Sequence, residues 1–245
     1  MTIPIEILAI IFVYVKCDKL ESIYDGIESI RYKMNKPQFY KTYLSYKKDK
    51  EELFKLGIEK NYKYSIKILL SEIDPSMDDN YAINRASQNR YMEIVKILIS
   101  DERVDPSARN NYAIRYASYK GHTEIVKLLL KDKRIDPSAG DNYAIRYASY
   151  NDHTEIVRLL LEDKRVDPSA NNNFAIRYAS EKGHTEIVKL LLKDKLVDPS
   201  ADDNFAIRMA SYNGHISIMK LLLEDKRIDP SAGDNFAIGL ASYKG

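Results

Sequence analysis

The chain has 245 residues with 38 Lys and Arg against 36 Asp and Glu, a formal net charge of only +2. This balance gives no support for a polyanion-binding protein or a polybasic membrane-surface protein, and 44% hydrophobic residues indicate a folded chain. The single cysteine, Cys17, excludes an intrachain disulfide and a cysteine-built zinc site, and suits a reducing compartment.

The longest apolar run extends from Ile7 to Val15. Its nine residues fall short of the roughly 20 that cross a bilayer. Glu6 precedes the run, the first six residues contain no Lys or Arg, and no small-residue cleavage site follows. We therefore predict a soluble cytoplasmic protein with no membrane partner; secretion, or anchoring by this run, is the less favoured alternative.

The start of the chain resembles the opening of an F-box, L-P-x-E-[IL]-[IL]-x-x-I, with Ile3 in place of the leucine. The matching residues are Pro4, Glu6, Ile7, Leu8 and Ile11. The resemblance implies that they dock the small adaptor of a cullin–RING ubiquitin ligase. Residues 1–46 would then be a short helical F-box-like module. The alternative is a helical cap that covers the first of the repeats that follow.

A degenerate repeat comes next, at residues 48–73. The segment from Leu53 to Leu70 aligns without gaps with Ala113 to Leu130 of a later, more regular repeat. We interpret it as an N-terminal capping repeat, because the terminal repeats of stacked arrays are atypical. It opens the repeat domain that we assign to residues 47–245.

Regular repeats start at Asp74 and have a period of 31 residues. The tripeptide Asp-Pro-Ser marks each of them, at Asp74, Asp105, Asp136, Asp167, Asp198 and Asp229. Each repeat predicts two helices, for example Tyr112 to Ser118 and Thr123 to about Lys131. Asn111 and Thr123 are expected to cap them, and Gly121 to end the first one in a left-handed conformation. The last repeat, 229–245, is incomplete and either belongs to a longer protein or serves as a crude cap.

Helices this short are marginal alone, so we predict an all-α solenoid in which each helix pair is covered by the next. The repeats resemble ankyrin repeats: Tyr112 to Ala117 takes the place of T-P-L-H-x-A, and Gly121-His122 precedes the characteristic stretch Glu124 to Leu130. The period is 31 rather than 33, which implies short fingers between repeats. With the F-box-like start and the abundance of Ile, Lys, Asn and Tyr, the chain is similar to ankyrin proteins of giant DNA viruses of amoebae, which implies a host cytoplasm.

No pattern in the sequence predicts catalysis, a metal or a cofactor. The four histidines fall in one repeat column, His122, His153, His184 and His215. Equivalent positions lie roughly 8–10 Å apart from repeat to repeat, so these side chains cannot converge on a metal ion. We expect each to form a local hydrogen bond. There is no phosphate-binding glycine loop, no H-E-x-x-H and no nucleophile elbow, so we predict a protein that is not an enzyme.

The repeats differ mainly in their fingers and at the ends of their first helices. The ankyrin resemblance places these positions on a concave binding face, and the alternative is ordinary variation of solvated loops. The predicted partner-binding strip is Arg109, Asn110, Tyr119, Lys120, Asp141, Tyr150, Asn151, Asn171, Asn172, Glu181, Lys182, Asp202, Asp203, Tyr212 and Asn213.

A further column holds Arg115, Arg146, Arg177 and Arg208. We expect these guanidinium groups to bond to finger carbonyls or Asp side chains, rather than to present cations to nucleic acid. The leading hypothesis is a monomeric, non-enzymatic adaptor that links an unidentified protein target to a ubiquitin ligase. The alternative is a plain ankyrin scaffold with no ligase link.

Overall fold

A computed structural model describes residues 50–228 of the chain, and every regular element in that range is an α-helix. The all-helical fold class is therefore confirmed. The predictions for residues 1–46, which include Pro4, Glu6, Ile7, Leu8 and Ile11, and for the repeat at 229–245 lie outside the described residues. The chain divides between Asp105 and Pro106 into two compact units, called unit 1 and unit 2. In the part that is described, no helix is long and apolar enough to span a membrane.

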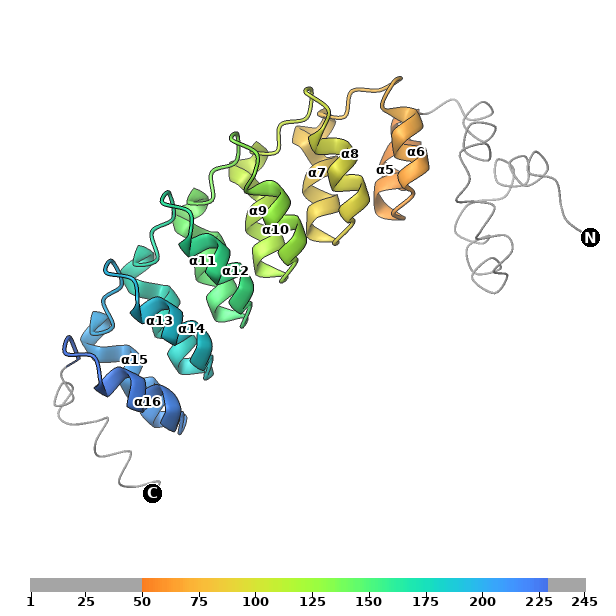
Figure 1. Cartoon of the computed structure of the whole chain (residues 1–245). Coiled ribbons are helices and arrows are strands. Elements are labelled where there is room, and N and C mark those ends of the chain that lie inside the picture. The colour runs from red at the N-terminus through yellow and green to blue at the C-terminus, as the bar shows by residue number, and fades with distance from the viewer. Residues whose placement is uncertain (1–49, 229–245) are drawn as a thin grey trace, which may run out of the picture. The chain divides into compact units, whose positions relative to one another are not determined.

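The described part of unit 1 contains two helix pairs (Figure 1), which are α5 (Lys50–Glu59) with α6 (Lys63–Leu69) and α7 (Met77–Gln88) with α8 (Met92–Ile99). Within each pair the helices pack on each other, and the pairs meet through α5 on α7 and α6 on α8. Fully buried side chains fill the space between them, among them Phe54, Ile66, Ile83 and Leu98. The segment from Leu53 to Leu70, aligned above with a later repeat, thus lies in a helix pair of its own.

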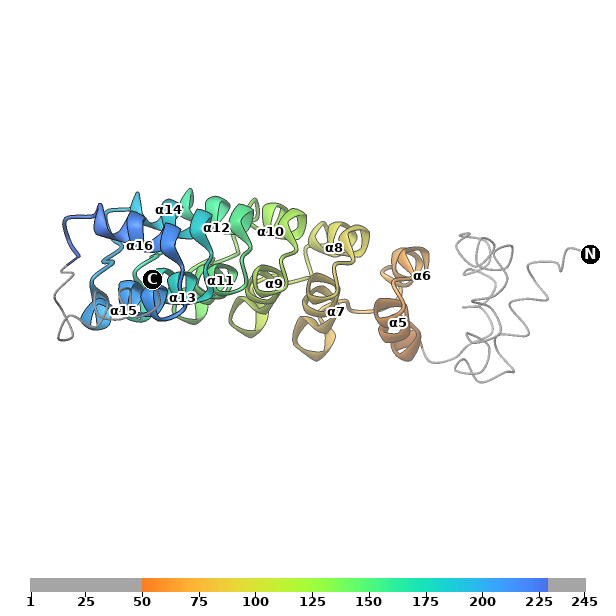
Figure 2. The same ribbon diagram turned by 90° about the horizontal axis from the view of Figure 1, so that it is seen from below.

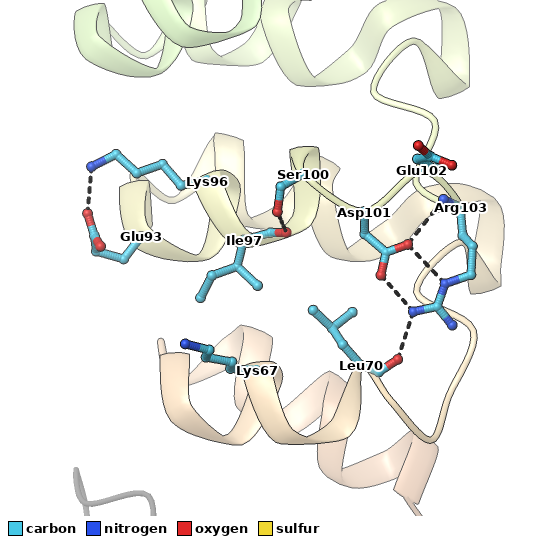
Figure 3. Close-up of a pocket in the computed structure, with 9 residues that line it drawn as sticks. All are labelled: Lys67, Leu70, Glu93, Lys96, Ile97, Ser100, Asp101, Glu102 and Arg103. Atoms are coloured by element: carbon cyan, nitrogen blue, oxygen red, sulfur yellow. Dashed lines mark hydrogen bonds and ion pairs between the residues drawn. The ribbon is translucent and has the colours of Figure 1, made fainter.

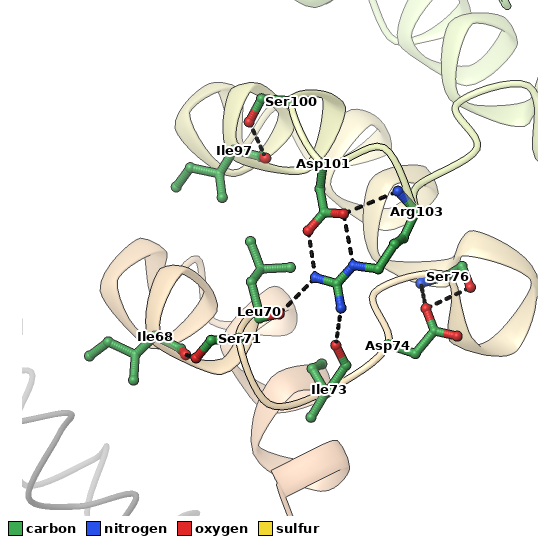
Figure 4. Close-up of polar contacts among 10 residues, drawn as sticks. All are labelled: Ile68, Leu70, Ser71, Ile73, Asp74, Ser76, Ile97, Ser100, Asp101 and Arg103. Carbon is green, nitrogen blue, oxygen red and sulfur yellow. Dashed lines mark hydrogen bonds and ion pairs between the residues drawn. The ribbon is translucent and has the colours of Figure 1, made fainter.

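An arginine holds the connector after α8 against the end of α6 (Figure 4). Arg103 makes two hydrogen bonds to the Asp101 carboxylate, of 2.9 and 2.6 Å, and donates to the carbonyl oxygens of Leu70 (2.7 Å) and Ile73 (2.9 Å). These bonds to the charged guanidinium hold the pKa of Asp101 below its ordinary value. The connector is thereby tied to the repeat before it.

Up to residue 228, unit 2 contains four helix pairs, and their first and second helices form two layers (Figure 2). The first helices are α9 (Ala108–Tyr119), α11 (Ala139–Tyr150), α13 (Ala170–Lys182) and α15 (Ala201–Tyr212). The second helices are α10 (Thr123–Leu129), α12 (Thr154–Leu161), α14 (Thr185–Leu192) and α16 (Ile216–Leu223). Neighbouring first helices pack more closely than neighbouring second helices. This difference bends the stack of unit 2 towards its first helices.

The core of unit 2 repeats with the sequence. In the first of its repeats, Ile114 and Ala117 of α9 and Val126 and Leu129 of α10 are fully buried. Their counterparts in later repeats are buried as well, except Met219 of α16, which is half-buried. The apolar spacing in the second helix follows one helical face, so each pair presents apolar surface to the next pair. Polar side chains are left for the turns, the helix ends and the solvent face of the second helices.

One local prediction is confirmed and one is wrong. Gly121 ends the first helix with φ +78°, in the left-handed region that suits glycine. Thr123, however, is the first residue of α10 rather than its cap. The capping position is His122, and its side chain makes no capping hydrogen bond.

Candidate functional site

The finger of each described repeat in unit 2 is a left-handed turn of three residues. All three have φ between +53° and +67° before the right-handed first helix continues. The residues are Arg109–Asn111, Gly140–Asn142, Asn171–Asn173 and Asp202–Asn204. Apart from Arg109 they are Gly, Asn or Asp, the residues that adopt this conformation at least cost. The first two side chains of each turn are exposed wherever they are not glycine.

The third residue of the turn links one repeat to the next. The Oδ1 atom of Asn111 accepts a hydrogen bond of 2.8 Å from the backbone N–H of Asp136, and Asn142 and Asn173 do the same, at 2.7 Å each, with the Asp that begins the next repeat. These asparagines are buried. The prediction that Asn111 caps its own helix is therefore wrong, because its carbonyl oxygen bonds across the repeat boundary.

The Asp-Pro-Ser tripeptide closes a turn through its own side chains. Asp136 Oδ1 accepts from the backbone N–H of Ser138 at 2.9 Å and from its hydroxyl at 2.6 Å. Asp167 with Ser169 and Asp198 with Ser200 make the same two bonds. The carboxylates of the most regular motif in the sequence thus face their own turns instead of a ligand.

The histidines tie each repeat to the one before it. The Nε2 atoms of His153, His184 and His215 lie 3.0–3.1 Å from carbonyl oxygens at the end of the preceding first helix. A carbonyl can only accept, so each Nε2 carries the proton. The expectation of a hydrogen bond is confirmed, but its partner is in the preceding repeat rather than local. Within the described residues, no three His, Cys, Asp or Glu side chains are grouped so as to hold a metal ion.

The arginine column has the structural role that the sequence predicts. Arg146 donates from Nε to the Asp141 carbonyl at 2.7 Å and from Nη2 to the Gly140 carbonyl at 3.1 Å, both in its own left-handed turn. Arg115 bonds to the Arg109 carbonyl at 3.1 Å, and Arg177 forms an ion pair with Asp202 of the next repeat. Arg146 and Arg177 are buried, so these cations are not presented to a partner.

Between the turns and the helix ends, aromatic rings form a continuous stack that we call the aromatic ladder. Its members are Tyr112, Tyr116, Tyr119, Tyr143, Tyr147, Tyr150, Phe174, Tyr178 and Phe205. The closest ring centroids within a helix lie 4.0–4.3 Å apart, as for Phe174 and Tyr178, and centroids of rings in neighbouring repeats lie 5.5–6.4 Å apart. All nine rings are half-buried.

The buried arginines also contact the aromatic ladder. The guanidinium carbon of Arg146 lies 5.3 Å from the centre of the Phe174 ring, and that of Arg177 lies 5.1 Å from Phe205. These distances are typical of cation–π contacts. The protein's own cations therefore cover part of the ring surface, and the rest of the half-buried rings remains accessible on this face.

The structure places the residues of the predicted strip at opposite ends of the first helices. The turn residues Arg109, Asn110, Asp141, Asn171, Asn172, Asp202 and Asp203 lie at one end and are exposed. Tyr119, Lys120, Tyr150, Asn151, Glu181, Lys182, Tyr212 and Asn213 lie at the other end, exposed or half-buried. About one helix length, roughly 10 Å, separates the two ends. We call the turns, the aromatic ladder and the helix ends together the first-helix face of unit 2.

Contacts within the first-helix face limit some members of the strip. Tyr119 and Tyr150 belong to the aromatic ladder, 6.0 and 6.1 Å from rings of the next repeat. A hydrogen bond to Tyr150 raises the pKa of Lys182, whose ammonium lies 5.1 Å from that ring. Asn213 donates to the Glu181 carbonyl at 3.1 Å. The acidic turn residues Asp141 and Asp203 remain exposed and differ from repeat to repeat.

The comparison with protein families now identifies the fold. A family model described as ankyrin repeats in three copies matches residues 54–141 and 145–234, more than two thirds of the chain. The chain belongs to the ankyrin-repeat family, whose repeats are protein-interaction modules. No curated protein matches the chain.

Proposed function

We propose that the chain is a non-enzymatic adaptor that binds a protein partner on the first-helix face of unit 2. One observation carries the proposal. The polar groups that recur from repeat to repeat, on Asn, His and Arg, are engaged in hydrogen bonds within or between repeats. The exposed positions of the turns are those that differ, and a surface that varies on a constant frame is suited to selective binding.

The partner is expected to meet both aromatic and charged surface. The half-buried rings offer area that costs little conformational entropy to cover. Asp141 and Asp203 place exposed carboxylates on the turn edge of the same face, so a partner with basic residues opposite them is favoured. The family membership supports this proposal, because ankyrin repeats are protein-binding modules.

The test is crosslinking of the full chain in lysate, with quantification of the captured partner by mass spectrometry. The variant Asp141→Asn with Asp203→Asn removes two charges from the turns and keeps the fold, since Asn110 and Asn172 stand at the same place in other repeats. The matched control, Glu155→Gln with Glu186→Gln, removes two exposed charges from the second helices. We expect capture to fall several-fold in the turn variant alone. An equal loss of capture in the two variants, or no loss in either, would rule out the turns as the binding surface.

A finer proposal concerns residues 1–46. We propose that Pro4, Glu6, Ile7, Leu8 and Ile11 dock the adaptor of a cullin–RING ubiquitin ligase in the cytoplasm, in an infected host cell if the source is viral. The resemblance of these residues to an F-box opening supports it. The alternative remains a scaffold without a ligase link.

A binding assay with purified F-box-binding adaptor distinguishes a ligase-linked adaptor from a scaffold without a ligase link. The full chain is compared with a deletion of residues 1–46 and with Pro4→Ala combined with Leu8→Asp, each checked by circular dichroism. Adaptor retained by the full chain and lost by both folded variants is the expected result. A well-folded full chain that retains no adaptor would leave a scaffold.

A further inference from the structure

A groove of about 810 Å³ lies in unit 1 between the second helices α6 and α8 (Figure 3). Leu70 at the end of α6 and Ile97 of α8 supply its apolar surface, and both side chains are half-buried. The volume is within the range of small-molecule and peptide-anchor sites. This groove is on the second-helix layer of unit 1, so it is separate from the first-helix face of unit 2.

One residue that lines the groove is smaller than its counterparts in unit 2. Ser100, at the end of α8, lines it, and its hydroxyl donates to the Ile97 carbonyl at 2.8 Å, back against its own helix. The same repeat position carries a long charged side chain in unit 2, at Lys131, Glu162, Lys193 and Glu224. Such a side chain would extend across the apolar surface, because long charged residues lay their methylene groups along it.

The charge at one end of the groove is also unlike that of the other repeats. Glu102 follows α8 in the connector, where the corresponding positions hold Lys133, Lys164, Lys195 and Lys226. Lys67 on α6 is at the opposite end (Figure 3), and the equivalent residues of later repeats are also basic. The groove therefore has one basic and one acidic end, whereas the corresponding places in unit 2 are basic at both.

Both of these end charges are available to a ligand. Lys67 and Glu102 are exposed, and neither has a hydrogen bond or ion pair in the part of the chain that is described. The other charges that line the groove pair among themselves: Lys96 with Glu93 at 2.8 Å, and Arg103 with Asp101 at 2.6 Å. The groove therefore has a net charge of +1 at its α6 end, from Lys67, and of −1 at its connector end, from Glu102.

We propose that this groove binds an amphipathic helix of another protein that carries an apolar residue between an acidic and a basic side chain. The apolar residue lies on Leu70 and Ile97, the acidic one faces Lys67 and the basic one faces Glu102. Helices laid in grooves between helices are a recurrent mode of peptide recognition. Charge complementarity, rather than a large apolar area, selects this partner.

The experiment uses the full chain and three synthetic helical peptides that share one apolar centre. Their flanking charges are acidic and basic, both acidic, or both basic. Binding is followed by NMR through the methyl groups of Leu70 and Ile97, which also locate the site. We expect the peptide with mixed charges to bind roughly three- to tenfold more tightly than either of the others, as expected for one or two exposed ion pairs.

Two variants make the test specific. Glu102→Lys restores the charge found in the other connectors, so the fold tolerates it, and the preference should change to the doubly acidic peptide. Ser100→Lys introduces the residue found at Lys131 and Lys193 and should weaken all three peptides. Glu162→Lys in unit 2 adds the same charge change elsewhere and should alter nothing.

Three results would overturn the proposal. The first is binding of none of the peptides, and the second is an order of affinities that Glu102→Lys leaves unchanged. The third is a concentration-dependent shift of the Ile97 methyl signal without peptide, which would assign the groove to a second copy of the chain. None of these results bears on partner capture by the first-helix face, so the two proposals fail independently.

Discussion

The two units use the same repeat positions with different chemistry. In unit 1, Arg85 of α7 bonds to the Glu59 carboxylate of α5 at 2.9 and 3.0 Å, and the Tyr81 hydroxyl donates to the same carboxylate. In unit 2 the positions of Arg85 and Glu59 are taken by Tyr147 and Tyr119, whose rings meet edge to face with centroids 6.0 Å apart. Unit 1 thus has a cluster of charged side chains at the positions where unit 2 has contacts between aromatic rings.

The surrounding frame is unchanged by this replacement. Tyr91 of unit 1 takes the place of His153 in unit 2, and each bonds to the carbonyl at the end of the preceding first helix, Glu59 (3.3 Å) or Tyr119 (3.1 Å). Repeat packing therefore fixes which carbonyl needs a donor but not which side chain supplies it. The two units should then differ in how their stability responds to salt and pH, which can be tested.

The largest effect is expected from removing one ring of the aromatic ladder. Phe174→Ala loses contacts with Tyr178 at 4.3 Å and Tyr147 at 5.5 Å, together with the Arg146 guanidinium. The expected loss is roughly 2–4 kcal/mol of unfolding free energy, and it should change little with salt. Urea denaturation at low and high salt measures both quantities.

Phe174→Tyr is the control for this prediction. Tyrosine stands at the same repeat position in Tyr112 and Tyr143, so the added hydroxyl fits at half-buried depth and should cost less than about 1 kcal/mol. If Phe174→Ala and Phe174→Tyr are equally stable, the rings of the aromatic ladder do not stabilise unit 2. The proposed difference between aromatic contacts in unit 2 and charged contacts in unit 1 would then be wrong.

A smaller effect is expected in the charged cluster. Glu59→Gln removes the anion that Arg85 and Tyr81 share, and both members of the ion pair are about one third exposed. We expect roughly 1–2 kcal/mol of local destabilisation, reduced in high salt because exposed charges are screened. Hydrogen exchange of the α5 and α7 amides reports it. A loss of equal size at low and high salt would mean that shape, rather than charge, holds unit 1 together.

The same cluster predicts a difference in pH dependence. The hydrogen bond from Arg85 is the main cause that lowers the pKa of Glu59 below its ordinary value of 4.5. The ionised carboxylate therefore adds stability above that value, and this contribution is lost as pH falls through the lower pKa of the folded state. Arg–Asp pairs on the connectors, such as Asp101 and Asp163, act in the same direction in both units.

Comparison of wild type with Glu59→Gln separates these contributions. Between about pH 5 and pH 3, the difference in protection of α5 and α7 should shrink in step with protonation of Glu59. The α11 and α13 amides should show no such difference. At the other extreme, burial and the bond to Glu59 raise the pKa of Tyr81 to about 12, so that the hydroxyl keeps donating well above neutral pH.

The sequence predicts those parts of the structure that depend on local pattern. The helix pairs follow from apolar spacing, the turn at Gly121 from glycine, and the bonds of Arg146 from the polar finger beside it. The left-handed turns escaped prediction, although runs such as Asn171–Asn173 consist of the residues that favour that conformation. The role of Asn111 across the repeat boundary depends on how repeats stack, and the groove at Ser100 appears only once two helices are placed side by side.

The smallest expected effect comes from a connector that departs from the pattern shared by both units. Leu196 stands where Arg103, Arg134, Arg165 and Arg227 bind their connectors, and it is 62% exposed. Its partner is already in place, because Asp194 accepts from the backbone N–H of Leu196 at 2.9 Å, as Asp163 does from Arg165. An arginine here would also reach the Val166 carbonyl, which corresponds to the Ile135 carbonyl bound by Arg165 at 2.6 Å.

Leu196→Arg should therefore stabilise unit 2 by roughly 0.5–1.5 kcal/mol, the net range for an ordinary intramolecular hydrogen bond, because solvent screens the exposed charge. Leu196→Lys carries the same charge but cannot bond to a carboxylate and a carbonyl at once, so it should gain less. Thermal unfolding of both variants measures the difference. Equal gains would show that removing an exposed leucine, not the paired hydrogen bonds, is what matters at this position. In that case the hydrogen bonds that Arg103 makes in unit 1 would add little stability when an arginine is placed at the same position of this connector.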